Sequence, residues 1–394
     1  MKTQPLSVAI LTTGRFHVAD LARELDRHGC EVTFYSDVPR WRIKGFLSPK
    51  VKVVSFFWPL LPLIALHRIA PQYFREISDR YLNMATDFLM SIFLKRCDVF
   101  IGMSGICMTS AVAARSRFGA KIVLERGSRH ILSQKEILDD ISRQFAGSWE
   151  RVSDWTVARE LRGYALADLV SVPSGHAERS FLERGFAKEK LFLNPYGVDT
   201  RMFSPVNGRS EVARRTAIMV GTWSYQKGCD LLADAFGPLG ANHFLIHVGA
   251  KGDAPMPKGQ PWFCHFDPVP QARLVEFYSR AAVLVLPSRQ DGFGVVLVQA
   301  LASGLVLIGS NRTGGADLRA VISDPRRVFE VTPDASAIRK GLIQAFALAQ
   351  EALPPIRSED LNALSWESYG KRYYHRLREL TEEVAVSQKF AGAK

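Results

Sequence analysis

The chain has 394 residues and a mass of 44.0 kDa, a length that indicates two or three domains rather than one compact core. Hydrophobic residues make up 47% of it and charged residues 23%, which is typical of a soluble globular protein and excludes a disordered, collagen-like or polytopic membrane chain. The formal net charge of +12 indicates an anionic partner.

The first half of the chain alternates β-rich runs with amphipathic segments, a pattern that predicts a parallel sheet with crossover helices. We expect a strand over residues 7–14 (SVAILTTG), a helix over 17–29 that ends at a glycine, and a second strand in CEVTFYS. The runs CDVFIGM, AKIVLER and ADLVSVPS repeat the pattern. The first run lacks the apolar length and the cleavage site of a signal peptide, so we expect a cytoplasmic protein.

A basic stretch runs from Val38 to Arg75. It holds seven Lys or Arg residues and no Asp or Glu, and it encloses the apolar run SFFWPLLPLIAL (Ser55–Leu66). A membrane-spanning helix needs ~20 apolar residues, so this run is too short to cross a bilayer. Apolar, Trp-containing segments between basic residues are typical of proteins that bind an anionic membrane surface, and we expect that here. The alternative is a buried strand and loop whose basic neighbours are merely solvated.

Neither nucleic acid nor zinc is indicated. The aromatic residues are not interleaved with basic ones as in RNA-binding signatures, and no zinc-finger spacing occurs. The five cysteines are an odd number, lie far apart and form no CxxC pair; they are Cys30, Cys97, Cys107, Cys229 and Cys264. We therefore expect no disulfide framework and no metal site, and a reducing compartment.

The alternation restarts after a segment rich in Pro, Gly, Asn and Ser (Asn194–Glu211). The runs TAIMVGTW, FLIHVGA, AVLVLPS and LVLIGS follow it. We expect two βαβ domains, 1–205 and 206–365, and a C-terminal helix in 366–394 that packs back on the first domain. A ligand of such a chain binds between the domains, at the carboxyl ends of the strands.

The most informative stretch is Pro287–Leu318. A strand ends near Ser288, a Gly-rich turn follows, and a helix begins near Val295; a second Gly-rich turn, 313–315, follows the next strand. Glycines let the backbone approach a ligand closely, and amides at a helix start favour an anion or a sugar hydroxyl. The residues alone leave two interpretations open: one phosphate- or sugar-binding edge, or two ordinary strand–helix turns.

This stretch resembles the nucleotide-sugar site of retaining glycosyltransferases of family four, group 1 type. The hallmark of that family is a Glu before Gly-Phe-Gly and a second Glu eight positions later, where this chain has Asp291 and Gln299. Residues 20–36 resemble the family's first helix and second strand, 194–205 its linker Asn-Gly-Val-Asp…Phe-x-Pro, and 220–236 its turn Gly-Arg-x-x-x-x-Lys-Gly. The resemblance implies the α/β fold called GT-B, in which two Rossmann-like domains face each other across a cleft. The N-terminal domain would then bind the acceptor and the C-terminal domain the nucleotide sugar.

The resemblance also implies a role for each matching residue. Lys227 would neutralise the donor diphosphate, through a charge-assisted hydrogen bond worth ~1.5–3 kcal/mol. Asp291 would accept from sugar hydroxyls, and Gln299 would bind the ribose. The full donor set comprises Gly14, Gly221, Thr222, Lys227, Asp291, Gly292, Phe293, Gly294, Val295 and Gln299. The alternatives are a solvated surface lysine at 227 and a helix-surface amide at 299.

The chain departs from the family pattern in the phosphate turn, where Thr222 replaces an Arg. Arg289 and Arg312, beside the two Gly-rich turns, are candidates to replace that charge; the alternative is that they are solvated. Asp291 is one methylene shorter than Glu. Gln299 lacks a charge but still donates and accepts hydrogen bonds.

The acceptor-side candidates lie in the N-terminal half. Where the family often has a His, this chain reads LERGSRH (Leu124–His130). The acceptor-side candidates are His17, Arg126, Ser128 and His130, and the catalytic candidates are Asp291, Lys227, His130 and Arg126. A lone His is more often structural than catalytic, which is the alternative for both histidines.

The resemblance implies a retaining transferase that needs no metal. It would move a hexosyl unit from a nucleoside-diphosphate sugar, which is its substrate and not a cofactor, to a hydroxyl of a lipid-linked or surface-polysaccharide acceptor at the cytoplasmic membrane face. No DxD motif stands where a metal–diphosphate site is expected. A soluble small-molecule glycosyltransferase, a sugar-nucleotide epimerase and a non-catalytic sugar-nucleotide-binding partner remain alternatives.

Overall fold

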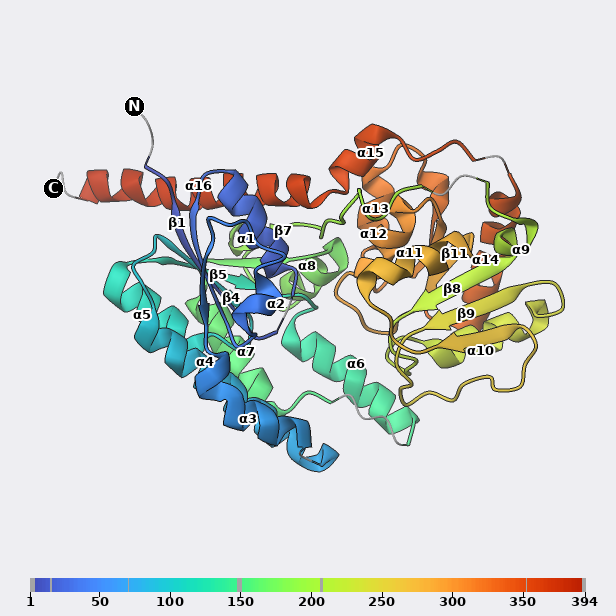
Figure 1. Cartoon of the computed structure of the whole chain (residues 1–394), viewed down its shortest axis with the longest axis horizontal. Coiled ribbons are helices and arrows are strands. Elements are labelled where there is room, and N and C mark those ends of the chain that lie inside the picture. Colours follow the sequence, from blue (N-terminus) through green and yellow to red (C-terminus); the bar gives the residue numbers. More distant parts are fainter. Residues whose placement is uncertain are drawn as a thin grey trace.

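The computed structural model describes residues 4–14, 16–69, 71–146, 151–205, 208–351 and 353–391. The chain forms two parallel sheets covered by helices, which are two Rossmann-like domains side by side (Figure 1). The two-domain α/β fold expected from the alternating pattern is confirmed. Within the described ranges, no helix combines the length and the apolar character needed to cross a bilayer.

The N-terminal domain contains a seven-stranded sheet in the order β3-β2-β1-β4-β5-β6-β7. All neighbours are parallel, and the central strands are buried, as their continuous apolar runs require. The strands are β1 (Ser7–Thr12), β2 (Glu31–Ser36), β3 (Lys52–Ser55), β4 (Val99–Met103), β5 (Lys121–Glu125), β6 (Leu169–Val172) and β7 (Leu191–Leu193). The strand order reverses between β1 and β4, so ligands are expected at the carboxyl ends of these strands.

Helices connect these strands in the right order for parallel pairing. They are α1 (Val18–Arg27), α2 (Arg40–Ile43), α3 (Phe57–Ile69), α4 (Gln72–Phe93), α5 (Met108–Phe118), α6 (Ile131–Gln144), α7 (Asp154–Leu166) and α8 (Gly175–Leu182), with a 3₁₀ turn, Lys188–Lys190, before β7. Most of the apolar run Ser55–Leu66 lies in α3, in which Leu60 is buried while Trp58 is 68% exposed. The alternative of a buried strand and loop is therefore wrong.

The C-terminal domain contains a six-stranded parallel sheet in the order β10-β9-β8-β11-β12-β13. Its strands are β8 (Thr216–Val220), β9 (Phe244–Val248), β10 (Phe263–Phe266), β11 (Val283–Leu286), β12 (Val306–Ser310) and β13 (Val328–Val331). Its helices are α9 (Glu211–Arg214), α10 (Cys229–Phe236), α11 (Gln271–Ser279), α12 (Val295–Ala302), α13 (Gly315–Val321), α14 (Ala335–Gln350) and α15 (Ser358–Ala363), with 3₁₀ turns Gly237–Leu239 and Pro325–Arg327. The order reverses between β8 and β11, which places the loops after these two strands at the switch point.

The last helix, α16 (Trp366–Ala391), leaves the C-terminal domain and lies along the N-terminal one (Figure 1). It packs on α1, where a Cβ added to Gly370 would come within 2.2 Å of the Glu24 Cβ atom. Its buried face repeats every three or four residues and consists of Tyr369, Tyr373, Leu377 and Leu380. The final helix therefore completes the core of the first domain.

Candidate active site

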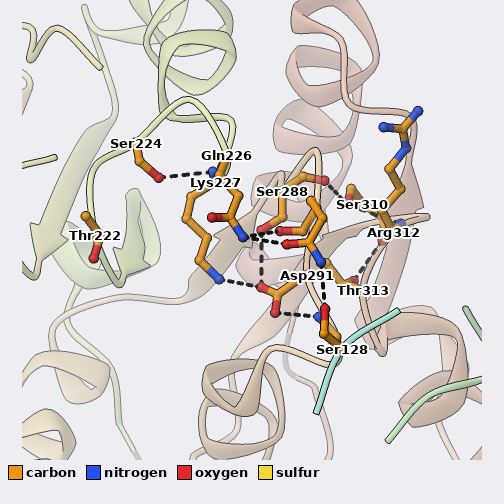
Figure 2. Close-up of polar contacts among 12 residues, drawn as sticks. Ser128, Thr222, Ser224, Gln226, Lys227, Ser288, Asp291, Ser310, Arg312 and Thr313 are labelled. Carbon is orange, nitrogen blue, oxygen red and sulfur yellow. Dashed lines mark hydrogen bonds and ion pairs between the residues drawn. The ribbon is translucent and has the colours of Figure 1, made fainter. Parts of the chain in front are cut away.

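The two charged residues of the predicted donor set form an ion pair. Lys227 precedes α10 and Asp291 follows β11, so both lie at the switch point of the C-terminal sheet. The Lys227 Nζ atom donates to Asp291 Oδ2 at 2.7 Å (Figure 2). The Ser288 hydroxyl donates to the same oxygen at 3.3 Å, and the Gly292 amide donates to Asp291 Oδ1 at 2.9 Å. The two side chains are 26% and 14% exposed, so the pair is held in place but remains open to solvent.

The Gly-rich turn after Asp291 presses against the N-terminal domain. A Cβ atom at Gly292 would lie 1.8 Å from the carbonyl oxygen of Gly127, so only glycine permits this approach. The Ser174 hydroxyl, at the start of α8, donates to the Gly292 carbonyl oxygen at 2.5 Å. Gly294 has a φ of +79° and is the N-cap of α12. The turn expected to bind the donor thus lies at the junction of the two domains.

The second Gly-rich turn packs on the first, as the sequence predicts. A Cβ at Gly314 would lie 2.1 Å from the ring of Phe293, which is buried and stands edge-on to the Tyr196 ring at 5.6 Å. The Thr313 hydroxyl donates to the Ser310 carbonyl at 2.7 Å and accepts from the Gly315 amide at 3.3 Å. The start of α12, where Val295 follows Gly294, is therefore braced by the loop after β12.

Polar side chains join the domains beside the ion pair. The Gln290 Nε2 atom donates to the Ser128 hydroxyl at 2.7 Å, and Gln226 Nε2 donates to the Gln290 carbonyl at 3.3 Å (Figure 2). The rings of Phe145 and Tyr225 stack across the same junction at 4.0 Å. The structure thus brings the predicted acceptor-side residue Ser128 next to the donor turn. Sequence reasoning missed both glutamines, although each directly precedes a predicted charged residue.

His17 is oriented by a buried carboxylate. Its Nε2 donates to Glu125 Oε2 at 2.7 Å, and the Tyr373 hydroxyl of α16 donates to Glu125 Oε1 at 2.6 Å. Glu125 is 1% exposed, and the ring of Tyr196 lies 4.3 Å from that of His17. Gly14, in the same loop, has a φ of +76° and an amide that donates to Asp37 at 2.8 Å. The loop after β1 therefore places an imidazole of defined orientation at the N-terminal switch point.

Arg126 and His130 are bound inside the N-terminal domain. Arg126 is buried and donates to the Arg129 carbonyl at 2.9 Å, to Glu160 at 3.0 Å and to Gln134 at 2.5 Å. His130 is 5% exposed and is the N-cap of α6, where its Nδ1 atom accepts from the Leu132 amide. Burial, helped by Arg126, lowers the pKa of His130 to about 4. Both residues have the geometry expected of a structural role.

The remaining sequence candidates lie further from the ion pair. Gln299 is 5% exposed, and its Oε1 atom accepts from the Tyr278 hydroxyl at 3.2 Å. Arg289, one candidate to replace the missing Arg, binds both oxygens of Asp230 at 2.6 and 2.7 Å. The other, Arg312, donates to the Arg289 carbonyl at 3.0 Å, and burial lowers its pKa. Within the described ranges, no three His, Cys, Asp or Glu side chains come together as a metal site requires.

The phosphate turn, Gly221 and Thr222, is held by a histidine that sequence reasoning missed. His247 of β9 is fully buried, and its Nε2 lies 2.8 Å from the Gly221 carbonyl oxygen. Burial lowers the pKa of His247 to about 4, so the ring is neutral at pH 7 and Nε2 carries its proton. Its Nδ1 then accepts from His265 Nδ1 at 2.9 Å. The only sequence signal was a polar residue inside the apolar run FLIHVGA.

Two family models match the chain, one in each domain. A model described as Glycosyltransferase Family 4 matches residues 15–201, and one described as Glycosyl transferases group 1 matches residues 214–385. The chain belongs to the family 4, group 1 glycosyltransferases. The family resemblance stated from the sequence motifs is therefore confirmed.

Solved structures of glycosyltransferases share the whole fold. Sucrose-phosphate synthase from Thermosynechococcus elongatus is 18% identical with a TM-score of 0.64, over 96% of this chain and 100% of that chain. A glycosyltransferase from Rickettsia africae is 14% identical with a TM-score of 0.65, over 96% and 99%. Anabaena HepE in complex with UDP and glucose is 13% identical with a TM-score of 0.64, over 95% and 100%. These likenesses establish the GT-B fold.

A curated relative matches part of the glycosyltransferase chain. It belongs to the phosphatidylinositol N-acetylglucosaminyltransferase of Arabidopsis thaliana, of which it is one subunit, and it is 25% identical over 228 residues. The matched region covers 53% of this chain and 49% of the relative, so the chain spans about half the length of that protein.

Proposed function

We propose that the chain is a retaining glycosyltransferase that moves a sugar from a nucleoside-diphosphate sugar to a hydroxyl of a lipid-linked or surface-polysaccharide acceptor. The observation that carries this proposal is the ion pair of Lys227 and Asp291 beside the Gly-rich turn that begins α12. An ammonium group next to the amides of a helix start is suited to a diphosphate. The Anabaena structure was solved with UDP and glucose, which supports a nucleotide-sugar donor.

The chemistry proposed for this site needs one exchange of partners. On donor binding, Lys227 leaves Asp291 for the diphosphate, and the freed carboxylate accepts from sugar hydroxyls. The bond between the sugar and the phosphate oxygen breaks, and the acceptor oxygen forms the new bond from the same face. The acceptor proton passes to the departing phosphate. The leaving group gains charge in this step, so the fixed ammonium stabilises the transition state more than the bound donor and replaces the charge of a metal ion.

We place the acceptor on the N-terminal side of the junction. His17 is the best-placed side chain there, because Glu125 and Tyr373 hold it at the switch point of the first sheet. Arg126 and His130 support the loop that carries Ser128 rather than contact the acceptor. The Arabidopsis relative is named for a phosphatidylinositol acceptor, which supports a lipid-linked acceptor at the cytoplasmic membrane face.

Calorimetry with UDP, GDP, ADP and their common sugar conjugates tests the donor site. We expect one diphosphate to bind, and Lys227→Ala to weaken its binding roughly 10- to 150-fold, the value of a charge-assisted hydrogen bond. Lys340→Ala, at an exposed position on α14 of the same domain, is the matched control and should bind normally. Activity that persists in EDTA would support a metal-independent reaction, and NMR of the product would establish the anomeric configuration. If no nucleotide binds, the proposal is wrong.

A second candidate function is a non-catalytic partner protein that binds a sugar nucleotide. Two observations favour it: Thr222 lacks the family's positive charge, and Gln299 is buried against Tyr278. This candidate predicts donor binding at ordinary affinity with neither transfer to any acceptor nor slow hydrolysis of the donor. Release of free sugar from the bound nucleotide sugar would rule it out.

A further inference from the structure

Helix α4 turns its apolar side chains away from the protein. Large apolar residues recur along it at intervals of three or four, so they share one helix face. This face, which we call the α4 ridge, consists of Phe74, Ile77, Tyr81, Met84, Phe88 and Ile92, each between 44% and 60% exposed. A contiguous apolar surface of this kind marks an interaction site.

The inner face of the same helix is the polar one. Asp87 is fully buried, and its carboxylate accepts from the amides of Thr109 and Ser110, each at 2.8 Å. Arg159 of α7 donates to it at 2.7 Å, which makes a buried ion pair. Thr86, also fully buried, donates to the Leu82 carbonyl. A helix that buries a carboxylate and exposes Phe, Tyr and Met reverses the usual order for a surface helix in water, which indicates an apolar phase outside it.

Helix α3 and the short helix α2 extend the apolar surface. Trp58, Leu66 and Ile69 of α3 are 68%, 55% and 79% exposed, and α3 packs beside α4. Trp41 of α2 is 62% exposed, and its ring lies 6.2 Å from that of Trp58. In Figure 1, α3 and α4 lie on the outside of the N-terminal domain, away from the C-terminal sheet.

The charges around this surface have one sign. Six basic side chains flank the apolar surface in the sequence and are all exposed; they are Arg40, Arg42, Lys44, Lys50, Lys52 and Arg68. The sequence from Val38 to Arg75 contains no acid, although Lys52 reaches within 3.9 Å of Glu31 on β2. The side chain of Arg75 lies outside the described part of the chain. Exposed aromatic and aliphatic groups bordered by cations match an anionic lipid surface, in which the aromatic rings sit at headgroup level.

We propose that the α4 ridge, together with α3 and Trp41, lies flat on an anionic lipid bilayer. The 22 residues of α4 give it a length of ~33 Å, so the ridge makes an extended contact parallel to the bilayer plane. The contact reaches beyond the basic stretch recognised in the sequence, because the α4 ridge begins near its end. It does not depend on the sugar donor, so vesicle binding and nucleotide binding can fail separately.

Flotation of the full-length protein with vesicles tests the apolar part of this contact. We expect binding to vesicles of phosphatidylcholine mixed with phosphatidylglycerol, and weaker binding to phosphatidylcholine alone. Ile92→Glu should reduce binding by at least ~10-fold, because it replaces an inserted side chain by an anion. Ile343→Glu on α14 is the matched control, since Ile343 is 54% and Ile92 50% exposed. Circular dichroism melts of both variants show whether each one is folded.

A second pair of variants tests the charged part. Replacing Arg40, Arg42 and Lys44 by Gln should weaken binding on the order of 100-fold at low salt, and added salt should remove most of the difference. The control replaces the exposed Lys251, Arg319 and Lys340 of the C-terminal domain by Gln and lowers the net charge equally. Equal losses in the two triple variants would mean that total charge alone drives binding, which overturns the proposal.

Two further outcomes contradict the membrane contact. One is a folded wild-type protein that binds neither kind of vesicle while still binding its nucleotide. The other is a dimer in light scattering that Ile92→Glu converts to a monomer, because the α4 ridge would then be an interface between two copies. Vesicle binding without nucleotide binding would leave this inference standing and reject the proposed donor site.

Discussion

At the scale of single residues, the site depends on groups that hold one another before any ligand arrives. Asp291 accepts three hydrogen bonds, from Lys227, Ser288 and the Gly292 amide, so its carboxylate is fixed in orientation. Gly292 in turn lies against the backbone of Gly127 in the other domain. A positively charged group and a carboxylate are thereby positioned by contacts across the domain junction, as electrostatic catalysis requires.

Gly292→Ala tests this arrangement. The added methyl group would overlap a backbone carbonyl oxygen at 1.8 Å, which no side-chain rotation relieves, so the turn and the Gly127 loop must move apart. We expect a loss of stability of about 1–3 kcal/mol in urea unfolding and loss of most transferase activity. Gly237→Ala is the matched control, because a Cβ there has no neighbour within 4 Å and its φ is −45°. Wild-type stability and activity in Gly292→Ala would show that the close approach is not needed.

At the scale of helices and strands, the sequence predicted what depends on local pattern and missed what depends on distant partners. The alternation of apolar runs and helices predicted both sheets, and the motif predicted that Lys227 and Asp291 act together. The three-to-four spacing of apolar residues in α4 predicts a helix face, but only the structure shows that this face points outwards. Tyr373 bonds Glu125, 248 positions away, and no local spacing could pair them.

The contact between α16 and β5 gives a prediction at this scale. Tyr373→Phe removes the hydroxyl that donates to Glu125 and leaves a fully buried carboxylate with fewer partners. We expect a loss of about 1–3 kcal/mol in the free energy of unfolding, with reduced activity because Glu125 also orients His17. Urea unfolding and a transfer assay measure the two effects. Tyr374→Phe, at the partly exposed neighbouring position, should change neither; equal effects of the two substitutions would reject a special role for the Tyr373 hydroxyl.

At the scale of the whole molecule, the two domains share one site, and several buried histidines lie close to it. Burial lowers the pKa of His130 and of His247 to about 4, and burial with Arg129 and Arg179 nearby lowers the pKa of His176 to about 3. His130 caps α6, His176 begins α8 at the junction, and His247 holds the phosphate turn. The contacts that shape the site therefore require neutral imidazoles.

This requirement predicts that the protein loses stability in mild acid. An unfolded histidine takes up a proton near pH 6.5, whereas the three folded ones stay neutral until about pH 4, so the unfolded state binds more protons between these values and its free energy falls. Each histidine should cost about 1.5 kcal/mol of unfolding free energy between pH 6.5 and pH 5. Asp37 and Asp317, whose pKa values burial raises, act in the opposite sense and reduce the total.

Urea unfolding at a series of pH values between 7.5 and 5 measures this slope. His130→Asn is the informative variant, because Asn retains the acceptor that caps α6 but does not titrate. We expect the number of protons taken up on unfolding at pH 5 to fall by close to one in this variant, while the stability at pH 7.5 changes little. An unfolding free energy that is flat or rises from pH 6.5 to pH 5 in the wild type would mean that these histidines are protonated in the folded protein. The neutral imidazole of His247 would then not be what holds the phosphate turn.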